Sequence, residues 1–185
     1  MNWIDTHTHL YLDQFKESID DVLGRCDKKG VNKLCLPAID SNSFASMMAL
    51  AEKRPESIFP MIGLHPCSVK ENYLEELNFI ESQLENPERF VAIGEIGIDL
   101  YWDTTFQEQQ VIAFKRQIEW AKALGKPIVI HARNSFREIF EVLEEINDDQ
   151  LFGVLHCFTG GKKHAKKAID LGFKLGIGGV ITFDQ

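Results

Sequence analysis

The stretch IDTHTHL, residues 4–10, carries three polar side chains in strict alternation within an otherwise β-like run. Successive side chains of a strand point to opposite faces of a sheet, so Asp5, His7 and His9 are expected to share one face. Two imidazoles placed in this way can bind one metal ion. The alternative is a polar edge strand whose histidines face water, and the rest of the chain must distinguish the two hypotheses.

The composition is that of an ordinary globular domain. Of the 185 residues, 44% are hydrophobic and 26% are charged, and the net charge is −8. We therefore expect a single domain over residues 1–185. An acidic chain is poorly suited to hold a polyanion through its overall field, so such a partner would need a local patch or bound cations.

The sequence carries no sign of a membrane segment or a secretion signal. No apolar run approaches the roughly 20 residues that span a bilayer, and no basic region followed by an apolar stretch opens the chain. We predict a cytoplasmic protein with no membrane partner. The four cysteines form no C-x-x-C pair, which argues against a zinc knuckle or a redox dithiol.

Short apolar runs alternate with amphipathic segments along the whole chain, which predicts parallel strands joined by crossover helices. The expected strands are NWIDTHTHL (2–10), VNKLCLPAI (31–39), SIFPMIGLHP (57–66), RFVAIGEIGI (89–98), KPIVIHAR (126–133), LFGVLHCF (151–158) and FKLGIGGVIT (173–182). The expected helices are residues 15–29, 43–54, 73–84, 105–124, 135–146 and 162–171. Units of roughly 30 residues fit a (β/α)8 barrel or an open doubly wound sheet. The first strand is not followed by G-x-G-x-x-G, which weakens the dinucleotide-binding version of the open sheet.

Chemically active residues gather at one position of this repeat. Five of the six histidines and one glutamate lie at or near the C-terminal end of an expected strand: His7, His9, His65, Glu95, His131 and His156. In a barrel these ends surround one axial site, because the βα loops open there. Each histidine alone is equally well explained as a structural residue, but the set together predicts a site for zinc, manganese, iron or a similar divalent ion.

Five motifs occur in the order DTHTHL, GLHP, GEIGID, HAR and HCFTGG, between residues 5 and 161. In these motifs the chain resembles the TatD family of metal-dependent deoxyribonucleases, which belongs to the amidohydrolase superfamily. The resemblance implies a TIM-type (β/α)8 barrel, here incomplete with about seven strands. It also implies cleavage of DNA phosphodiester bonds, as a 3′-to-5′ exodeoxyribonuclease, by a metal-activated hydroxide. DNA, in single strands or at 3′ ends, would be the partner.

The resemblance also assigns roles to the clustered residues. His7 and His9 would bind one divalent ion, His131 and His156 a second, and Glu95 would bridge the two, with Mg, Mn or Zn as the metals. His65 would contact the scissile phosphate or line the pocket, and packing beside Pro66 is the alternative. These ions would offset phosphate charge, which reconciles an acidic protein with a polyanionic substrate.

Three more residues are candidates for contact with the substrate. Arg133 in HAR could hold a phosphate through two donors, or it could be an ordinary surface charge. Asp99 could orient a metal ligand or touch the substrate, and its alternative is a turn residue or helix cap. Tyr101, followed by Trp102, could stack an unpaired base, and packing on the barrel rim is the alternative.

The family pattern has one more element, a downstream strand that ends in an acidic metal ligand, which the sequence up to ITFDQ does not contain. The domain is therefore expected to be C-terminally truncated relative to the family, and Asp184 is not expected to replace that ligand. Seven strands would leave an open seam, which an oligomer could cover. General-base help is typically worth about 10²–10⁴-fold, so the missing acid bears directly on activity.

Two other functions remain open from the sequence. The same metal site could hydrolyse lactones or cyclic amides, as other amidohydrolases do. A truncated barrel could also bind metal or a partner without efficient turnover, which the missing acidic motif suggests.

Overall fold

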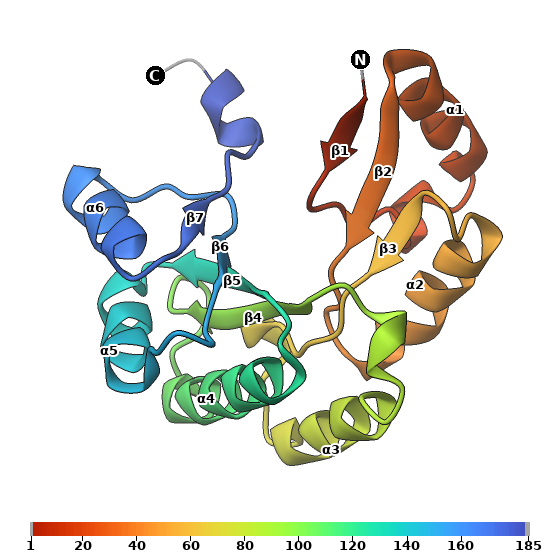
Figure 1. The fold of residues 1–185 in the computed structure, drawn as a ribbon. Helices are drawn as coiled ribbons and strands as arrows, with labels where there is room; N and C mark the ends of the chain where they lie inside the picture. The colour runs from red at the N-terminus through yellow and green to blue at the C-terminus, as the bar shows by residue number, and fades with distance from the viewer. Residues whose placement is uncertain (1, 184–185) are drawn as a thin grey trace.

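The computed structural model of the protein describes residues 2–183, so Asp184 lies outside the described part of the chain. Within these described residues, seven strands alternate with six α-helices, as the sequence predicts (Figure 1). The strands are β1 (Trp3–Asp5), β2 (Val31–Leu36), β3 (Ile58–Pro60), β4 (Ile93–Asp99), β5 (Ile128–Arg133), β6 (Gly153–Leu155) and β7 (Lys174–Leu175). The helices are α1 (Ile19–Lys29), α2 (Ser41–Lys53), α3 (Tyr73–Gln83), α4 (Gln107–Leu124), α5 (Phe136–Ile146) and α6 (Lys162–Asp170). Four 3-10 turns accompany them: η1 (Asp13–Phe15), η2 (Pro66–Ser68), η3 (Pro87–Arg89) and η4 (Gly179–Thr182).

All strand pairs are parallel and follow the order of the chain. One sheet has the order β1-β2-β3 and the other the order β4-β5-β6-β7. An isolated bridge from Ile62 to Ile93, with hydrogen bonds on either side of it, links the two sheets. Figure 1 shows the helices along the outside of the curved strand array, with β1 and β7 at its two ends.

The two faces of the array are packed differently. Ile128 and Ile130 belong to the main core cluster, whereas Val129 belongs to a small second cluster with Met61 and Ala92. Because side chains alternate along a strand, these clusters lie on opposite faces of β5. His131 follows Val129 by two residues and therefore shares its face. The alternation of β5 thus directs this histidine away from the helices.

One expectation from the first stretch is wrong. Strand β1 ends at Asp5, and His7 and His9 lie in the loop that follows it. Asp5 does not join the histidines, because its carboxylate accepts a hydrogen bond from the backbone N–H of His7 over 3.0 Å. An aspartate that bonds the backbone two residues ahead makes a turn, and this turn ends the strand.

A bulge in β4 sets the direction of Glu95. Gly94 pairs with Val129 and Ile96 with Ile130, so Glu95 is an extra residue without a partner in β5. Such bulges redirect a side chain and commonly lie beside active sites. Close by, Gly97 has a φ of +140°, and a Cβ atom there would collide with the backbone oxygen of His131. A glycine at this position therefore allows β4 and β5 to lie side by side next to the bulge.

Two buried glutamines of α4 hold the backbone of the loops beside the strand ends. The amide of Gln117 accepts a hydrogen bond from the backbone N–H of Leu64 over 2.7 Å and donates to its carbonyl over 3.4 Å. Gln110 makes the same pair of bonds with the backbone of Asp99, at 2.8 and 3.2 Å. Each side-chain amide thus makes the pair of hydrogen bonds that a neighbouring strand would make with the same backbone. Helix α4 thereby fixes the backbone next to His65 and at Asp99.

No helix among the described residues combines the length and apolar character that a bilayer crossing needs.

We predict that Gln117→Leu lowers the free energy of unfolding by about 1–3 kcal/mol, because it leaves the buried N–H of Leu64 without an acceptor. Urea denaturation would measure the change. The same substitution at exposed Gln150 is the matched control and should change stability by less than about 0.5 kcal/mol. Equal effects of the two substitutions would contradict this role for Gln117.

Candidate active site

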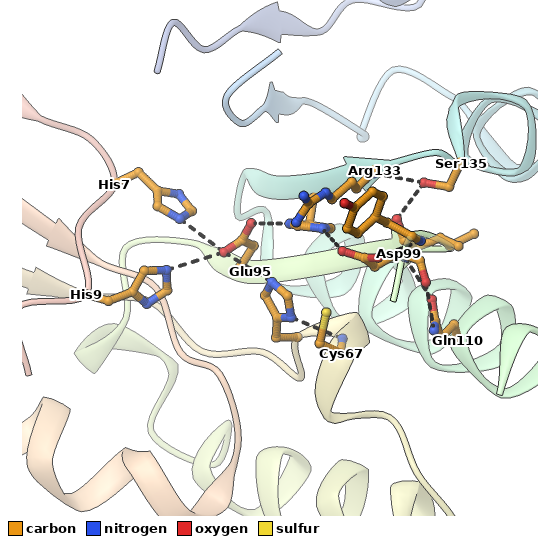
Figure 2. Close-up of polar contacts among 12 residues, drawn as sticks. His7, His9, Cys67, Glu95, Asp99, Gln110, Arg133 and Ser135 are labelled. Carbon is orange, nitrogen blue, oxygen red and sulfur yellow. Dashed lines mark hydrogen bonds and ion pairs between the residues drawn. The ribbon is translucent and has the colours of Figure 1, made fainter. Parts of the chain in front are cut away.

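The site is built around one buried carboxylate, that of Glu95, whose side chain is 3% exposed. Its Oε2 lies 3.0 Å from Nε2 of His7 and 3.5 Å from Nε2 of His9. Its Oε1 lies 3.0 Å from Nδ1 of His131. Figure 2 shows His7 and His9 approaching Glu95 from one side, with Asp99 and Arg133 on the other. His7 and His131 thus meet at one carboxyl group, although they lie 88 and 36 residues from Glu95 in the sequence.

The charges of the site are mutually stabilised. Burial would raise the pKa of Glu95, but hydrogen bonds from His131, His7 and His9 outweigh it and hold the pKa well below its usual range. Burial would lower the pKa of His131, but the bonds and charges of Glu95 and Asp99 outweigh it and raise the pKa. The carboxylate of Glu95 is therefore anionic.

Tyr11 determines which nitrogen of His9 faces Glu95. The Tyr11 hydroxyl donates its single proton to the carbonyl oxygen of Pro37 over 2.6 Å. It can therefore only accept from Nδ1–H of His9, 2.9 Å away. When His9 is neutral, its Nε2 then presents a lone pair to the carboxylate of Glu95. Two acceptors 3.5 Å apart repel each other unless a proton or a metal cation lies between them.

Asp99 orients the ring of His131 from the opposite side of the site, as Tyr11 orients that of His9. Its Oδ2 lies 2.7 Å from Nε2 of His131, and the residue is 2% exposed. A hydrogen bond from Nε2–H to this carboxylate leaves Nδ1 of His131 facing Glu95. Carboxylates that orient a histidine through its outer nitrogen are a regular feature of metal sites. Asp99 is thus placed to orient His131, and its burial keeps it from an approaching substrate.

His65 has the opposite tautomer to that of neutral His9. Its Nδ1 accepts a hydrogen bond from the backbone N–H of Cys67 over 3.1 Å. Burial lowers the pKa of His65 to about 4, so the ring is neutral at pH 7. The proton of the neutral ring therefore resides on Nε2, which lies 3.7 Å from Oε2 of Glu95. His65 presents a donor to the site, where His9 presents an acceptor.

His156 lies against His7, and among the described residues it forms no ion pair with Glu95. The two rings are stacked with centroids 3.3 Å apart and an interplanar angle of 10°. Burial, followed by the nearby His7, lowers the pKa of His156 to about 4. Nδ1 of His7 is buried, and residues 2–183 offer it no hydrogen-bond partner. Buried polar atoms that lack a partner are rare and are often found at functional sites.

In the part of the chain that the structure describes, two sets of side chains lie close enough to hold a metal: His7, His9 and Glu95, and His65, Glu95 and His131, with ligand atoms within 4.8 Å of one another. Imidazole nitrogen and carboxylate oxygen suit divalent zinc, manganese and iron. The first set fits a cation, because a lone pair and a carboxylate already face each other there. The second fits less well, because His65 directs a proton inward. The resemblance implies His156 in place of His65.

Arg133 and Tyr101 lie beside this cluster. Strand pairing sets Arg133 opposite Asp99, and the guanidinium carbon lies 3.9 Å from the centroid of the Tyr101 ring. A cavity of about 410 Å³ adjoins them and is lined by His131, Ala132, Arg133, His156, Cys157, Thr159 and Val180. This volume falls in the range typical of small-molecule sites.

Sequence reasoning missed three residues that hold the site together. Tyr11 continues the alternation of His7 and His9 by one more step, so a signal was present in the sequence. Gln110 and Gln117 are polar residues on the apolar face of α4, two helical turns apart, and this position also distinguishes them from surface residues. Each of the three also bonds a backbone atom distant in the sequence, at Pro37, Asp99 or Leu64, which no local pattern indicates.

Comparisons with known proteins identify relatives over nearly the whole chain. Residues 4–185 match the family described as TatD related DNase. YabD of Bacillus subtilis, described as an uncharacterized metal-dependent hydrolase, is 32% identical over 179 residues, which cover 97% of this chain and 69% of that protein. YjjV of Escherichia coli, with the same description, is 33% identical over 184 residues, or 99% of this chain and 70% of that protein.

Solved structures agree with this result. The crystal structure of E. coli YjjV, a TatD homolog, matches with a TM-score of 0.85 and 32% identity over 98% of this chain and 70% of that one. A TatD family hydrolase of Entamoeba histolytica matches with a TM-score of 0.82 and 24% identity, over 96% of this chain and 65% of that one. The latter shows the fold alone. The predicted incomplete TIM-type barrel is thereby confirmed.

We predict that Tyr11→Phe weakens the binding of Mn²⁺ or Zn²⁺ by about 10- to 100-fold, because His9 loses the acceptor that fixes its tautomer. Calorimetric titration of the metal-free protein would measure the affinity. Tyr73→Phe removes a hydroxyl for which the described residues provide no hydrogen bond, and it should bind metal as the parent does. An unchanged affinity in Tyr11→Phe would refute the orienting role.

Proposed function

This chain belongs to the TatD related DNase family of metal-dependent hydrolases, and from this membership together with its site we propose that it hydrolyses phosphodiester bonds of DNA with divalent metal ions. We further propose digestion from 3′ ends, which follows from the resemblance. The observation that supports the proposal most strongly is the buried carboxylate of Glu95, which neutral His9 faces with the lone pair of its Nε2.

His7, His9 and Glu95 would hold one cation, and Glu95, His131 and His156 a second. Bound divalent cations would act as Lewis acids on the phosphate. They would also lower the pKa of water, so that a nucleophile is available at neutral pH. The protein's own residues orient the groups that would bind these cations. Tyr11 and Asp99 fix the tautomers of His9 and His131, so both rings are ready to bind without rearrangement.

His65 and Arg133 supply donors to the phosphate in this proposal. Nε2–H of neutral His65 points into the site, where it can donate to a phosphoryl oxygen as negative charge grows there. The Arg133 guanidinium has no carboxylate within ion-pair distance among the described residues, so its positive charge is available to an anion. Planar guanidinium groups bind phosphate with two parallel hydrogen bonds.

We predict that Glu95→Gln lowers metal-dependent hydrolysis of a 3′-labelled single-stranded oligonucleotide by at least about 100-fold, because the neutral amide of glutamine is a poor ligand to a cation. The assay is run with Mg²⁺ or Mn²⁺, and circular dichroism checks the fold. His164→Ala is the control, because this exposed histidine packs on Phe136 outside the site and should keep full activity.

Three results would count against the proposal. Equal activity in the parent and Glu95→Gln would point to a contaminating nuclease. An inactive parent would contradict DNA hydrolysis by this chain. Hydrolysis of a lactone without hydrolysis of thymidine 5′-(p-nitrophenyl) phosphate would assign the same site to carbon chemistry.

We predict that His65→Ala lowers kcat/KM for the oligonucleotide by about 10²–10³-fold and leaves metal affinity within about twofold of the parent. The combination of steady-state kinetics and metal titration separates a donor to the phosphate from a metal ligand. A loss of metal affinity comparable to that of His9→Ala would make His65 a ligand instead.

A further inference from the structure

An exposed aromatic pair lies at the edge of the site. Tyr101 is 51% exposed and Trp102 is 70% exposed, and both follow directly after β4. Their rings meet edge to face, with centroids 4.7 Å apart and an interplanar angle of 88°. The Arg133 guanidinium lies over both rings, 3.9 Å from the centroid of Tyr101 and 5.2 Å from that of Trp102. Two adjoining aromatic rings and a guanidinium thus share one exposed surface.

The loop that carries the pair is fastened at both ends. At its start, the backbone N–H of Tyr101 donates to Oδ1 of Asp99 over 2.9 Å, and Oδ2 of the same carboxylate contacts His131. At its end, Asp103 forms an ion pair with Lys70 at 3.0 Å and accepts from the backbone N–H of Thr105. The exposure of Trp102 therefore does not result from a loose loop, and Asp99 ties the pair directly to the site.

The geometry of Arg133 leaves its donors free. A guanidinium stacked on a ring uses its face, so the N–H groups at its edge remain available to an anion. Its backbone is also fixed, because its N–H donates to Ser135 Oγ over 3.1 Å and its carbonyl accepts from Leu100 over 2.9 Å. Phosphate oxygens at the edge of Arg133 would place the attached sugar and base over the neighbouring rings.

We propose that Tyr101, Trp102 and Arg133 form a stacking surface for an unpaired base of the substrate strand, with Trp102 as the residue whose ring carries the base. The inference rests on the proposed function and names the residue that holds a base of its substrate. A base paired within a duplex is already stacked on its neighbours, so its face is not available to the exposed ring of Trp102. Stacking on an aromatic side chain accepts any base, and it therefore selects for strand form and not for sequence.

The test compares two probes of equal charge, both with phosphorothioate linkages that resist hydrolysis, in the presence of Mg²⁺, so that binding is measured on the metal-loaded protein without turnover. One is a fluorescently labelled single-stranded thymidine decanucleotide, and the other is a labelled decamer of tetrahydrofuran units that has no bases. Anisotropy gives the dissociation constant of each for the parent, Trp102→Ala, Trp102→Phe and Trp3→Ala. Trp3 is an exposed tryptophan of β1 outside the loop and supplies the matched control.

We expect Trp102→Ala to weaken binding of the thymidine strand by about 5- to 150-fold and to leave binding of the abasic strand unchanged. Trp102→Phe should retain most of the affinity, and Trp3→Ala should behave as the parent. Equal losses on both strands, or no loss on either, would overturn the proposal. Base-dependent binding by a parent that hydrolyses no DNA would uphold the stacking surface and refute only the proposed function.

Discussion

The structure depends on the anionic carboxylate of Glu95, which is buried among imidazole rings and needs positive charge around it. A buried charge is stable only when it is paired, but when His9 and His131 are neutral the ring nitrogens that face the carboxylate present lone pairs, which cannot pair it. Tyr11 and Asp99 enforce this arrangement for His9 and His131 by occupying the outer nitrogen of each ring. A cation satisfies the carboxylate and the lone pairs together, so the same interaction that organises the cluster also defines its chemistry.

The fold provides this arrangement through the ends of its strands. The bulge in β4 turns Glu95 toward the histidines, and Gly97 allows β5 to approach close enough for His131 to reach it. Gln110 and Gln117 hold the adjacent loops from the side of α4, where side-chain amides replace a neighbouring strand. Packing of α4 on the sheet is thereby coupled to the position of Asp99 and His65, so the core and the site cannot be altered independently.

The sequence predicts the order and kind of the elements well, because hydrophobic periodicity and glycine ends such as Gly30 and Gly125 act locally. It also predicts that histidines and Glu95 meet, since parallel strands bring their ends together. It fails where the decisive contact is distant. The alternation of His7 and His9 suggests a continuous strand, but the turn at Asp5 ends β1 before them. Likewise, the tautomers of His9 and His65 depend on Tyr11, Pro37 and the backbone of Cys67, which no spacing rule connects.

The most direct measurement of the central claim is anomalous X-ray scattering from crystals of the protein soaked in Mn²⁺, with data collected above and below the manganese absorption edge. An edge-dependent peak is expected between Nε2 of His9 and Oε2 of Glu95, with Nδ1 of His9 still bonded to the hydroxyl of Tyr11. Strong manganese peaks elsewhere in the protein, with none between these two atoms, would contradict a metal site at Glu95.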